Sequence, residues 1–262
     1  MTIAFISDLH LEPVENDKTL GFFNFLDSAQ NKYQQLYILG DFFEYWIGDD
    51  DNEPVNLSIQ QKLKVATDSG LDIFFVHGNR DFLIGSEFEK NTGVKIIEDM
   101  TLIEIGNKSV MVAHGDSFCT DDVEYQEMKK EIRSDSWKNT FLAKSIDERI
   151  AFANNMRAES AKRSSNKPEN IMDVNCDYVS QIISDHNIDY LIHGHFEEQR
   201  IELMNELVGI MVVCHQKNVA HLDLKPRNIM VYKADDGEYH LKLIDFGFAE
   251  RRYVVSGSTA VK

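Results

Sequence analysis

The segment Leu36-Tyr-Ile-Leu-Gly-Asp41 decides the fold class, because it joins a short apolar run to a turn glycine and a carboxylate. The same organisation recurs along the first three-quarters of the chain, where β-rich runs alternate with amphipathic stretches. The expected strands are Thr2–Ser7, Leu36–Leu39, Ile73–Val76, Val110–Ala113 and Tyr190–Ile192, and the expected helices lie near 19–30, 56–69, 122–134, 137–157 and 172–186. This alternation predicts an α/β domain with covered sheet faces.

Each expected strand is followed at once by polar side chains that can bind a metal ion. These are Asp8 and His10, Asp41, Asn79, His114, and His193 with His195. In open α/β sheets, ligands gather beyond the carboxyl ends of the strands, so we expect these groups to share one crevice. A single Asp after a strand is usually a turn residue or a helix cap. Five ordered blocks at five strand ends are hard to obtain by chance.

The composition of this set favours a site for two divalent cations. Asp, Asn and His suit Mn²⁺, Mg²⁺, Zn²⁺ or Fe²⁺, and no cysteine belongs to the set. Asp8 and His10 lie two positions apart, so an extended chain presents both on one side. Gly40 allows the tight turn that lets Asp41 bridge two ions. Arg80 suits an anionic oxygen, and two neighbouring ions can bind a phosphate and activate water for its hydrolysis.

Composition and charge exclude several classes of protein. The 262 residues carry 27 Lys and Arg against 44 Asp and Glu, a formal net charge of −17, and 43% are hydrophobic. Such a chain can bury a core, but it has no basic surplus to neutralise nucleic-acid phosphates. The three scattered cysteines favour a reducing, cytosolic compartment. No signal peptide or bilayer-spanning stretch is visible, so we expect a soluble protein that at most lies on a membrane surface.

The ordered set D-x-H, G-D, G-N-R-D, H-G-D and G-H resembles the calcineurin-like metallophosphoesterases. Over residues 1–195, blocks such as Tyr37-Ile-Leu-Gly-Asp41, His77-Gly-Asn-Arg-Asp81 and Ile171-Met-Asp-Val-Asn175 also resemble the UDP-2,3-diacylglucosamine pyrophosphatases. The resemblance implies a metallophosphoesterase sheet sandwich with flanking helices. It implies hydrolysis of UDP-2,3-diacylglucosamine to lipid X and UMP, a step of lipid A biosynthesis, in the cytoplasm and peripheral to the inner membrane. The implied cofactor is a pair of Mn²⁺ ions, with Mg²⁺ or another divalent ion as the alternative.

The resemblance also implies roles for individual residues. One ion would be held by Asp8 and His10, the bridge would be Asp41, and the other ion would be held by Asn79, His114 and His195. Catalysis would depend on Asp41, Asn79, Arg80 and His114. The glucosamine–phosphate head would contact Asn79, Arg80, Asp122, Ser160, Ser164, Lys167 and His195. The family often has Asn where this chain has Ser164, which leaves that contact open.

Residues 122–170 would form a helical lid. Its apolar residues recur at near-helical spacing: Trp137, Phe141, Leu142, Ile146, Ile150 and Met156. Such a stripe is usually part of a core. It would also suit a slot for two acyl chains, with a basic cluster that faces phosphate or an anionic membrane surface. That cluster comprises Arg157, Lys162, Arg163 and Lys167.

The resemblance breaks at Gly194-His195-Phe-Glu197. The family pattern is G-H-x-H, and its last His completes the first metal site, where this chain has Glu197. Glu197 either ligates the metal through its carboxylate or is a surface residue. The family's closing strands are also missing. We therefore expect a sheet that is incomplete on its C-terminal side, with an exposed edge beyond Tyr190–Ile192, and an impaired activity.

Residues 197–262 resemble a different family. They contain His221-Leu-Asp223-Leu-Lys225-Pro-Arg-Asn228 and Leu243-Ile-Asp245-Phe-Gly247, which have the spacing of the catalytic loop and the D-F-G of a protein kinase. Ile229–Lys233 and His240–Ile244 would form the hairpin between them. We therefore divide the chain into a metallophosphoesterase domain, 1–196, and a kinase-like fragment, 197–262. Natural recombination, an engineered fusion and an error in sequence assembly would all give this pattern.

Three functions remain open from the sequence. The first is the impaired lipid-nucleotide hydrolase, and the second is a non-catalytic protein that binds metal and lipid. The third is a kinase-like nucleotide binder built on Asp223, Lys225, Asn228 and Asp245. It would lack the Gly-rich loop, the strand Lys and the Glu partner that a kinase needs. Nothing in the sequence indicates an oligomeric state.

Overall fold

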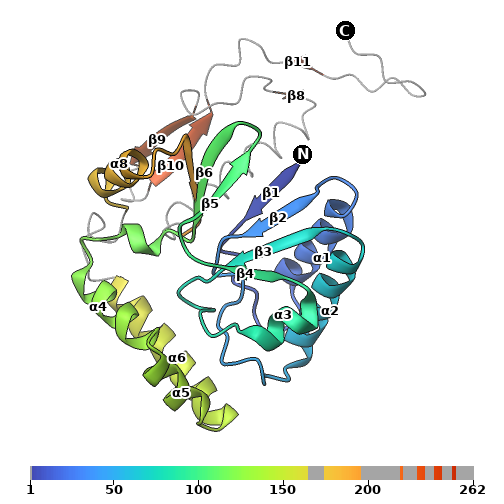
Figure 1. Cartoon of the computed structure of the whole chain (residues 1–262), viewed down its shortest axis with the longest axis vertical. Coiled ribbons are helices and arrows are strands. Elements are labelled where there is room, and N and C mark those ends of the chain that lie inside the picture. The colour runs from blue at the N-terminus through green and yellow to red at the C-terminus, as the bar shows by residue number, and fades with distance from the viewer. Residues whose placement is uncertain are drawn as a thin grey trace. The chain divides into compact units, whose positions relative to one another are not determined.

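The computed structural model describes residues 2–164 and 174–195, together with the backbone of four short strands nearer the C-terminus. The chain divides into two compact units, Met1–His195 and Phe196–Lys262. Two β-sheets and all the described helices belong to the first unit (Figure 1). Within the described part of the chain, no helix is long and apolar enough to cross a membrane.

The first sheet is parallel throughout. Its strands are β1 (Ile3–Ile6), β2 (Gln35–Ile38), β3 (Asp72–Val76) and β4 (Lys95–Ile97), in that spatial order. The helices between them are α1 (Asp17–Ala29), α2 (Pro54–Asp68) and α3 (Ser86–Thr92). Helix α1 begins where the side chain of Asn16 accepts a hydrogen bond from the amide of Thr19, and α2 begins with Pro54. Neither α3 nor β4 was expected from the sequence.

The second sheet has three strands. Strand β6 (Lys108–Ala113) lies between β5 (Thr101–Ile105), to which it is antiparallel, and β7 (Tyr190–His193), to which it is parallel. Among the described residues, β7 pairs only with β6, and Tyr190 is 56% exposed. The described part of the sheet therefore ends at β7, the edge at which the sequence predicted an incomplete sheet.

Alternate residues of the first sheet serve two different cores. On β2, Leu36 and Ile38 pack into the core that includes residues of α1, α2 and α3. Tyr37 and Leu39 point to the other face, where they belong to a second cluster with Val110 and other residues of the second sheet. Both faces of β2 are therefore buried, which explains why its sequence is a continuous apolar run. The predicted sheet sandwich with flanking helices is confirmed.

A helical arm follows the second sheet. After the 3₁₀ turn η1 (Asp116–Phe118) come α4 (Val123–Ile132), α5 (Asp135–Leu142) and α6 (Ile146–Ser164), and α8 (Cys176–Asp185) precedes β7 (Figure 1). The single helix expected over 137–157 is wrong. Ser145 and Glu148 form a reciprocal capping box, in which each side chain contacts the other residue's amide, so a new helix begins there.

The second unit contains two short antiparallel pairs. Strand β9 (Ile229–Lys233) pairs with β10 (Tyr239–Leu243), as the sequence predicted for this hairpin within one residue. Strand β8 (Val219–Ala220) pairs with β11 (Glu250–Arg251).

Candidate metal centre

The backbone turns sharply at four of the predicted metal ligands. The φ angle is 54° at Asp8, 48° at His10, 48° at Asp41 and 55° at His195. Residues other than glycine rarely adopt this left-handed conformation, and those that do often lie at functional sites. Three strands, β1, β2 and β7, thus end in a strained turn whose residues are candidates for metal binding.

Two glycines allow these strand ends to approach one another. A Cβ atom on Gly40 would lie 2.6 Å from the Cα of Gly78 and 2.6 Å from Nδ1 of His114. A Cβ on Gly78 would lie 2.2 Å from the amide nitrogen of Asp41. No side chain fits at either position, so the G-D and G-N pairs of the sequence are required by the close packing of these loops.

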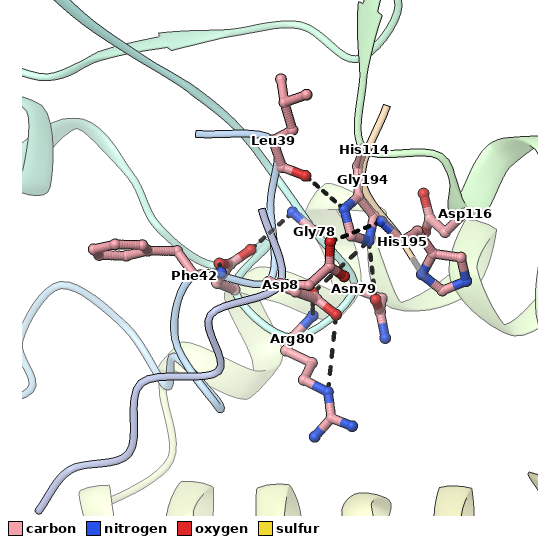
Figure 2. Close-up of polar contacts among 12 residues, drawn as sticks. Asp8, Leu39, Phe42, Gly78, Asn79, Arg80, His114, Asp116, Gly194 and His195 are labelled. Carbon is pink, nitrogen blue, oxygen red and sulfur yellow. Dashed lines mark hydrogen bonds and ion pairs between the residues drawn. The ribbon is translucent and has the colours of Figure 1, made fainter. Parts of the chain in front are cut away.

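The predicted ligands form two groups that share one carboxylate. Asp8, His10 and Asp41 make up the first group, and Asp41, His114 and His195 make up the second. Within each group, one ligand atom from each residue lies within 4.8 Å of the others. Figure 2 shows Asp8, Asn79, Arg80 and His114 gathered at one point. A carboxylate common to both groups has the position that a bridge between two ions requires.

The side chain of Asn79 lies between His114 and Asp41. With its nitrogen turned toward them, its carboxamide donates to Nε2 of His114 at 3.1 Å and to the two carboxylate oxygens of Asp41 at 3.1 and 2.7 Å. A carboxamide oxygen, an imidazole nitrogen and a carboxylate are all donors that divalent cations accept, so these three groups fit a metal ion at this point.

The carbonyl of Leu39 fixes the ring of His114. Nδ1 of His114 lies 2.8 Å from this carbonyl oxygen, which can only accept, so Nδ1 carries a hydrogen (Figure 2). Nε2, on the side of Asn79 and Asp41, is then the atom left to bind a metal.

Burial sets the ionisation of the ligands. It lowers the pKa of His10 to about 3 and that of His195 to about 4, so both rings are neutral at neutral pH. Burial raises the pKa of Asp41 to about 7. Burial also disfavours the charged form of His114, but the negative charges around the ring, Asp41 foremost, outweigh it and raise its pKa. A cation that binds between Asp41 and His114 would therefore compete with protons for these two side chains.

A buried carboxylate that the sequence analysis did not single out holds two loops together. Asp81 is fully buried and accepts hydrogen bonds from the amides of Phe42, at 2.7 Å, and Gly78, at 2.8 Å. It thereby ties the loop after β2 to the loop after β3, and so fixes Asp41 relative to Asn79. The G-N-R-D block contains this residue, and the final D of the block was the available signal.

A second unpredicted carboxylate attaches α4 to the centre. Asp116, fully buried, lies 2.9 Å from Nζ of Lys129 and 3.5 Å from a guanidinium nitrogen of Arg133, and it accepts from the hydroxyl of Tyr125 at 2.6 Å. Burial raises the pKa of Asp116, but the surrounding positive charges lower it further, well below its usual range. The ion pairs therefore persist at all moderate pH values.

A cavity of about 270 Å³ extends from the centre to the helical arm. Its polar end is lined by Asn79, Arg80, Asp122, Tyr125, Arg157 and His195, and its apolar end by Trp46, Phe82, Trp137, Phe141, Phe152 and Met156. The predicted apolar stripe thus contributes to the cavity in part. Leu142, Ile146 and Ile150 do not line it, and Phe141 is also part of the main core. Phe152, absent from the predicted stripe, packs with its ring tilted against Trp137 and edge-on to Phe141.

The remaining predicted residues have different outcomes. Asp122 lines the cavity and also caps α4 by accepting from the amide of Tyr125 at 3.1 Å. His193 lies outside both ligand groups, and its ring contacts Phe118. Ser160 and Ser164 belong to α6, whose backbone alone is described there. The other predicted side chains lie outside the described residues: Lys167, Glu197, Asp223, Lys225, Asn228 and Asp245.

Comparison with known proteins agrees with this site. The model of the calcineurin-like phosphoesterase family matches residues 1–196. A UDP-2,3-diacylglucosamine hydrolase of Cellvibrio japonicus is 40% identical over 195 residues, which are 74% of this chain and 81% of that protein. The hydrolase of the same name from Haemophilus influenzae is 34% identical over 218 residues, 83% of this chain and 92% of that protein.

The chain belongs to the calcineurin-like phosphoesterases, in the family of the UDP-2,3-diacylglucosamine hydrolases. It is by descent a metal-dependent phosphoester hydrolase, and its cofactors are divalent metal ions. A protein of unknown function from Aquifex aeolicus is a weaker structural match, with a TM-score of 0.29, 22% identity, and coverage of 50% of this chain and 71% of that chain. The model of the protein kinase domain also matches, over residues 141–259, consistent with the kinase-like motifs near the C-terminus.

Proposed function

We propose that this phosphoesterase hydrolyses the pyrophosphate bond of UDP-2,3-diacylglucosamine, giving lipid X and UMP, as a step of lipid A biosynthesis. The observation that carries the proposal is the cavity, which extends from Asn79 and His195 of the ligand set to an aromatic compartment. A lipid-nucleotide has the same division, with charged phosphates next to acyl chains. The relatives named for this substrate support the assignment.

The metal ions are proposed to be two Mn²⁺, with Mg²⁺ or another divalent ion as the alternative. Asp8 and His10 would hold one ion, Asn79, His114 and His195 the other, and Asp41 both. Bound there, the ions would polarise the phosphate and lower the pKa of water. Glu197 takes the place of a ligand of the first ion, so we propose that this half of the centre binds its metal more weakly.

The protein itself orients the phosphates. Arg80 lies beside the shared carboxylate, since its amide donates to Oδ1 of Asp41 at 2.9 Å and its side chain, 29% exposed, lines the cavity. Its planar guanidinium can bind two phosphate oxygens at once. Arg157, on α6, presents a second guanidinium to the same cavity. The two arginines would offset the charge of the pyrophosphate and hold it against the ligand set.

The apolar end of the cavity is proposed to bind the acyl chains. Trp137 and Phe141 stack with ring centroids 4.8 Å apart, and Phe152 lies across them. Aromatic surfaces of this kind gain free energy when an alkyl chain covers them. A substrate with two acyl chains resides in a bilayer, so we propose that the enzyme acts in the cytoplasm, peripheral to the inner membrane.

The decisive experiment measures UMP release and metal content together. The purified full chain, loaded with Mn²⁺, is incubated with UDP-2,3-diacylglucosamine, and UMP is quantified by chromatography while bound manganese is counted per chain. Two ions with UMP release would support the proposal. About one tightly bound ion per chain without turnover would instead favour a non-catalytic protein that binds metal and lipid, and no bound ion without turnover would mean that the centre has lost its chemistry.

A further inference from the structure

Glu44 lies between the metal centre and the helical arm. It follows Asp41 by three residues in the loop after β2, its side chain is 12% exposed, and it lines the cavity. Neither the sequence motifs nor the predicted ligand set include it. Its two carboxylate oxygens face three different nitrogen-bearing side chains.

One oxygen of Glu44 holds two arginines from separate parts of the fold. Oε1 lies 2.7 Å from Nη1 of Arg80, in the loop after β3, and 2.8 Å from Nη2 of Arg157, on α6. Two guanidinium groups at one point would repel each other strongly in a partly buried site without this negative charge. Arg157 has a second contact, because its guanidinium lies 5.9 Å from the ring centroid of Tyr45. Glu44 thus brings both arginines to the polar end of the cavity.

The other oxygen of Glu44 faces a predicted metal ligand. Oε2 lies 3.5 Å from Nδ1 of His10, and this nitrogen is buried without a hydrogen-bond partner in the described structure. A histidine that binds metal through one nitrogen usually donates its other N–H to a carboxylate or carbonyl, which fixes the ring. A shift of a few tenths of an ångström would make Glu44 that acceptor.

We propose that Glu44 is a positioning residue, whose one carboxylate sets Arg80 and Arg157 for the substrate phosphates and orients His10 toward its metal. The inference rests on the proposed function only for the identity of the substrate phosphates. The contacts of Glu44 with the two arginines and His10 are independent of it. The substrate meets the two arginines, and Glu44 acts through them. Because one arginine is on α6, the same carboxylate also holds the arm against the centre.

The test compares three variants of the full chain. Glu44→Gln keeps the shape and removes the charge, Glu44→Asp keeps the charge on a shorter side chain, and Glu87→Gln removes the same charge from an exposed pair with Lys90. For each variant, KM and kcat are measured with UDP-2,3-diacylglucosamine, Mn²⁺ affinity is measured by calorimetry, and hydrogen exchange is followed in α6.

Removal of the negative charge of Glu44 should weaken the binding of substrate and of Mn²⁺, and it should also loosen the contact of α6 with the centre. For Glu44→Gln we expect KM to rise about tenfold with a smaller change in kcat. Mn²⁺ affinity should fall by about 10- to 100-fold, and the amides of α6 should exchange faster. Glu44→Asp should lose less in every measurement, and Glu87→Gln should match the parent protein.

Wild-type values for Glu44→Gln would overturn the inference, and so would equal losses in Glu44→Gln and Glu44→Asp, since shape rather than charge would then matter. If the parent protein does not cleave the lipid, the proposed function fails. Mn²⁺ affinity and exchange in α6 still decide the role of Glu44 in that case, because neither measurement uses the substrate.

Discussion

Nε2 of His114 lies 3.8 Å from Oδ1 of Asp41, and both side chains are almost completely shielded from solvent. Burial raises the pKa of Asp41 to about 7, although His114 acts in the opposite direction, and the carboxylates around His114, Asp41 foremost, outweigh burial and raise the pKa of that ring. A bound divalent cation would take the place of these protons between Asp41 and His114. The centre therefore exchanges protons for metal.

Metal affinity should fall as the pH is lowered through neutrality. Below their raised pKa values, Asp41 and His114 hold protons that a cation must displace, so the apparent affinity for Mn²⁺ should drop by about tenfold per pH unit for each proton released. His10 and His195 titrate near 3 and 4 and contribute nothing above pH 5. Calorimetric titrations at pH 6, 7 and 8, in buffers of different ionisation enthalpy, count the protons directly. A pH-independent affinity would contradict this account.

Asp41→Ala should abolish binding of both ions. The residue belongs to both ligand groups, so its loss leaves each with two of its three clustered ligands. We expect manganese per chain to fall from two to none and phosphoesterase activity to fall by about a thousandfold, since the ions supply several kcal/mol of transition-state stabilisation. Asp189→Asn, at an exposed pair with Lys108, removes the same charge and should leave the metal count unchanged.

Short-range patterns account for what was predictable in this chain. Tyr37 and Leu39 face one core while Leu36 and Ile38 face the other, so an apolar run bounded by Gly40 was enough to indicate a doubly covered strand. The clustering of the candidate metal ligands was predictable because each belongs to the turn that follows a strand. Their position depends on local chain direction, which a strand and a turn glycine determine.

Contacts between distant segments account for what was missed. Glu44 meets Arg157 across 113 positions of the sequence, and no pattern in either segment points to the other. The pairing of Asp116 with Lys129 depends on how the turn η1 directs α4. The helix break before α6, in contrast, could have been predicted, because Ser145 and Glu148 have the spacing of a capping box in the sequence.

Asp116→Asn should destabilise the attachment of α4. The substitution leaves the ammonium of Lys129 and the guanidinium of Arg133 without their buried counter-charge, which costs about 3 kcal/mol. Urea unfolding of the metal-free parent chain and of the variant at pH 7 measures this loss of stability. Because the folded pKa of Asp116 lies below its ordinary value of 3.8, its contribution is complete above about pH 5 and is lost as the pH falls further. A stability difference that shrinks between pH 8 and pH 6 would contradict this assignment.

Hydrogen exchange should distinguish the interior strand β2 from the edge strand β7. Strand β2 is paired on both sides, whereas β7 pairs only with β6 within the described residues. We expect the amides of Leu36 to Ile38 to exchange more slowly than those of β7 by at least an order of magnitude. We also expect the amides of the hairpin β9–β10 to exchange faster than those of β1. Mass spectrometry of peptides from the native chain gives these rates. A hairpin as protected as β1 would show that the second unit is stabilised as strongly as the first.

Glu197→His tests whether one side chain limits the centre. The substitution restores an imidazole at the position where the related family has its last histidine, so the first ion should bind more tightly and UMP release should rise by about 10-fold or more. Manganese per chain should approach two at lower Mn²⁺ concentrations than in the parent protein. Glu197→Gln is the matched control, because it removes the charge without adding an imidazole. If Glu197→His gains metal but no activity, a feature other than position 197 limits the enzyme, as we expect if the sheet lacks the family's closing strands. If it gains neither, position 197 does not contribute to the first metal site.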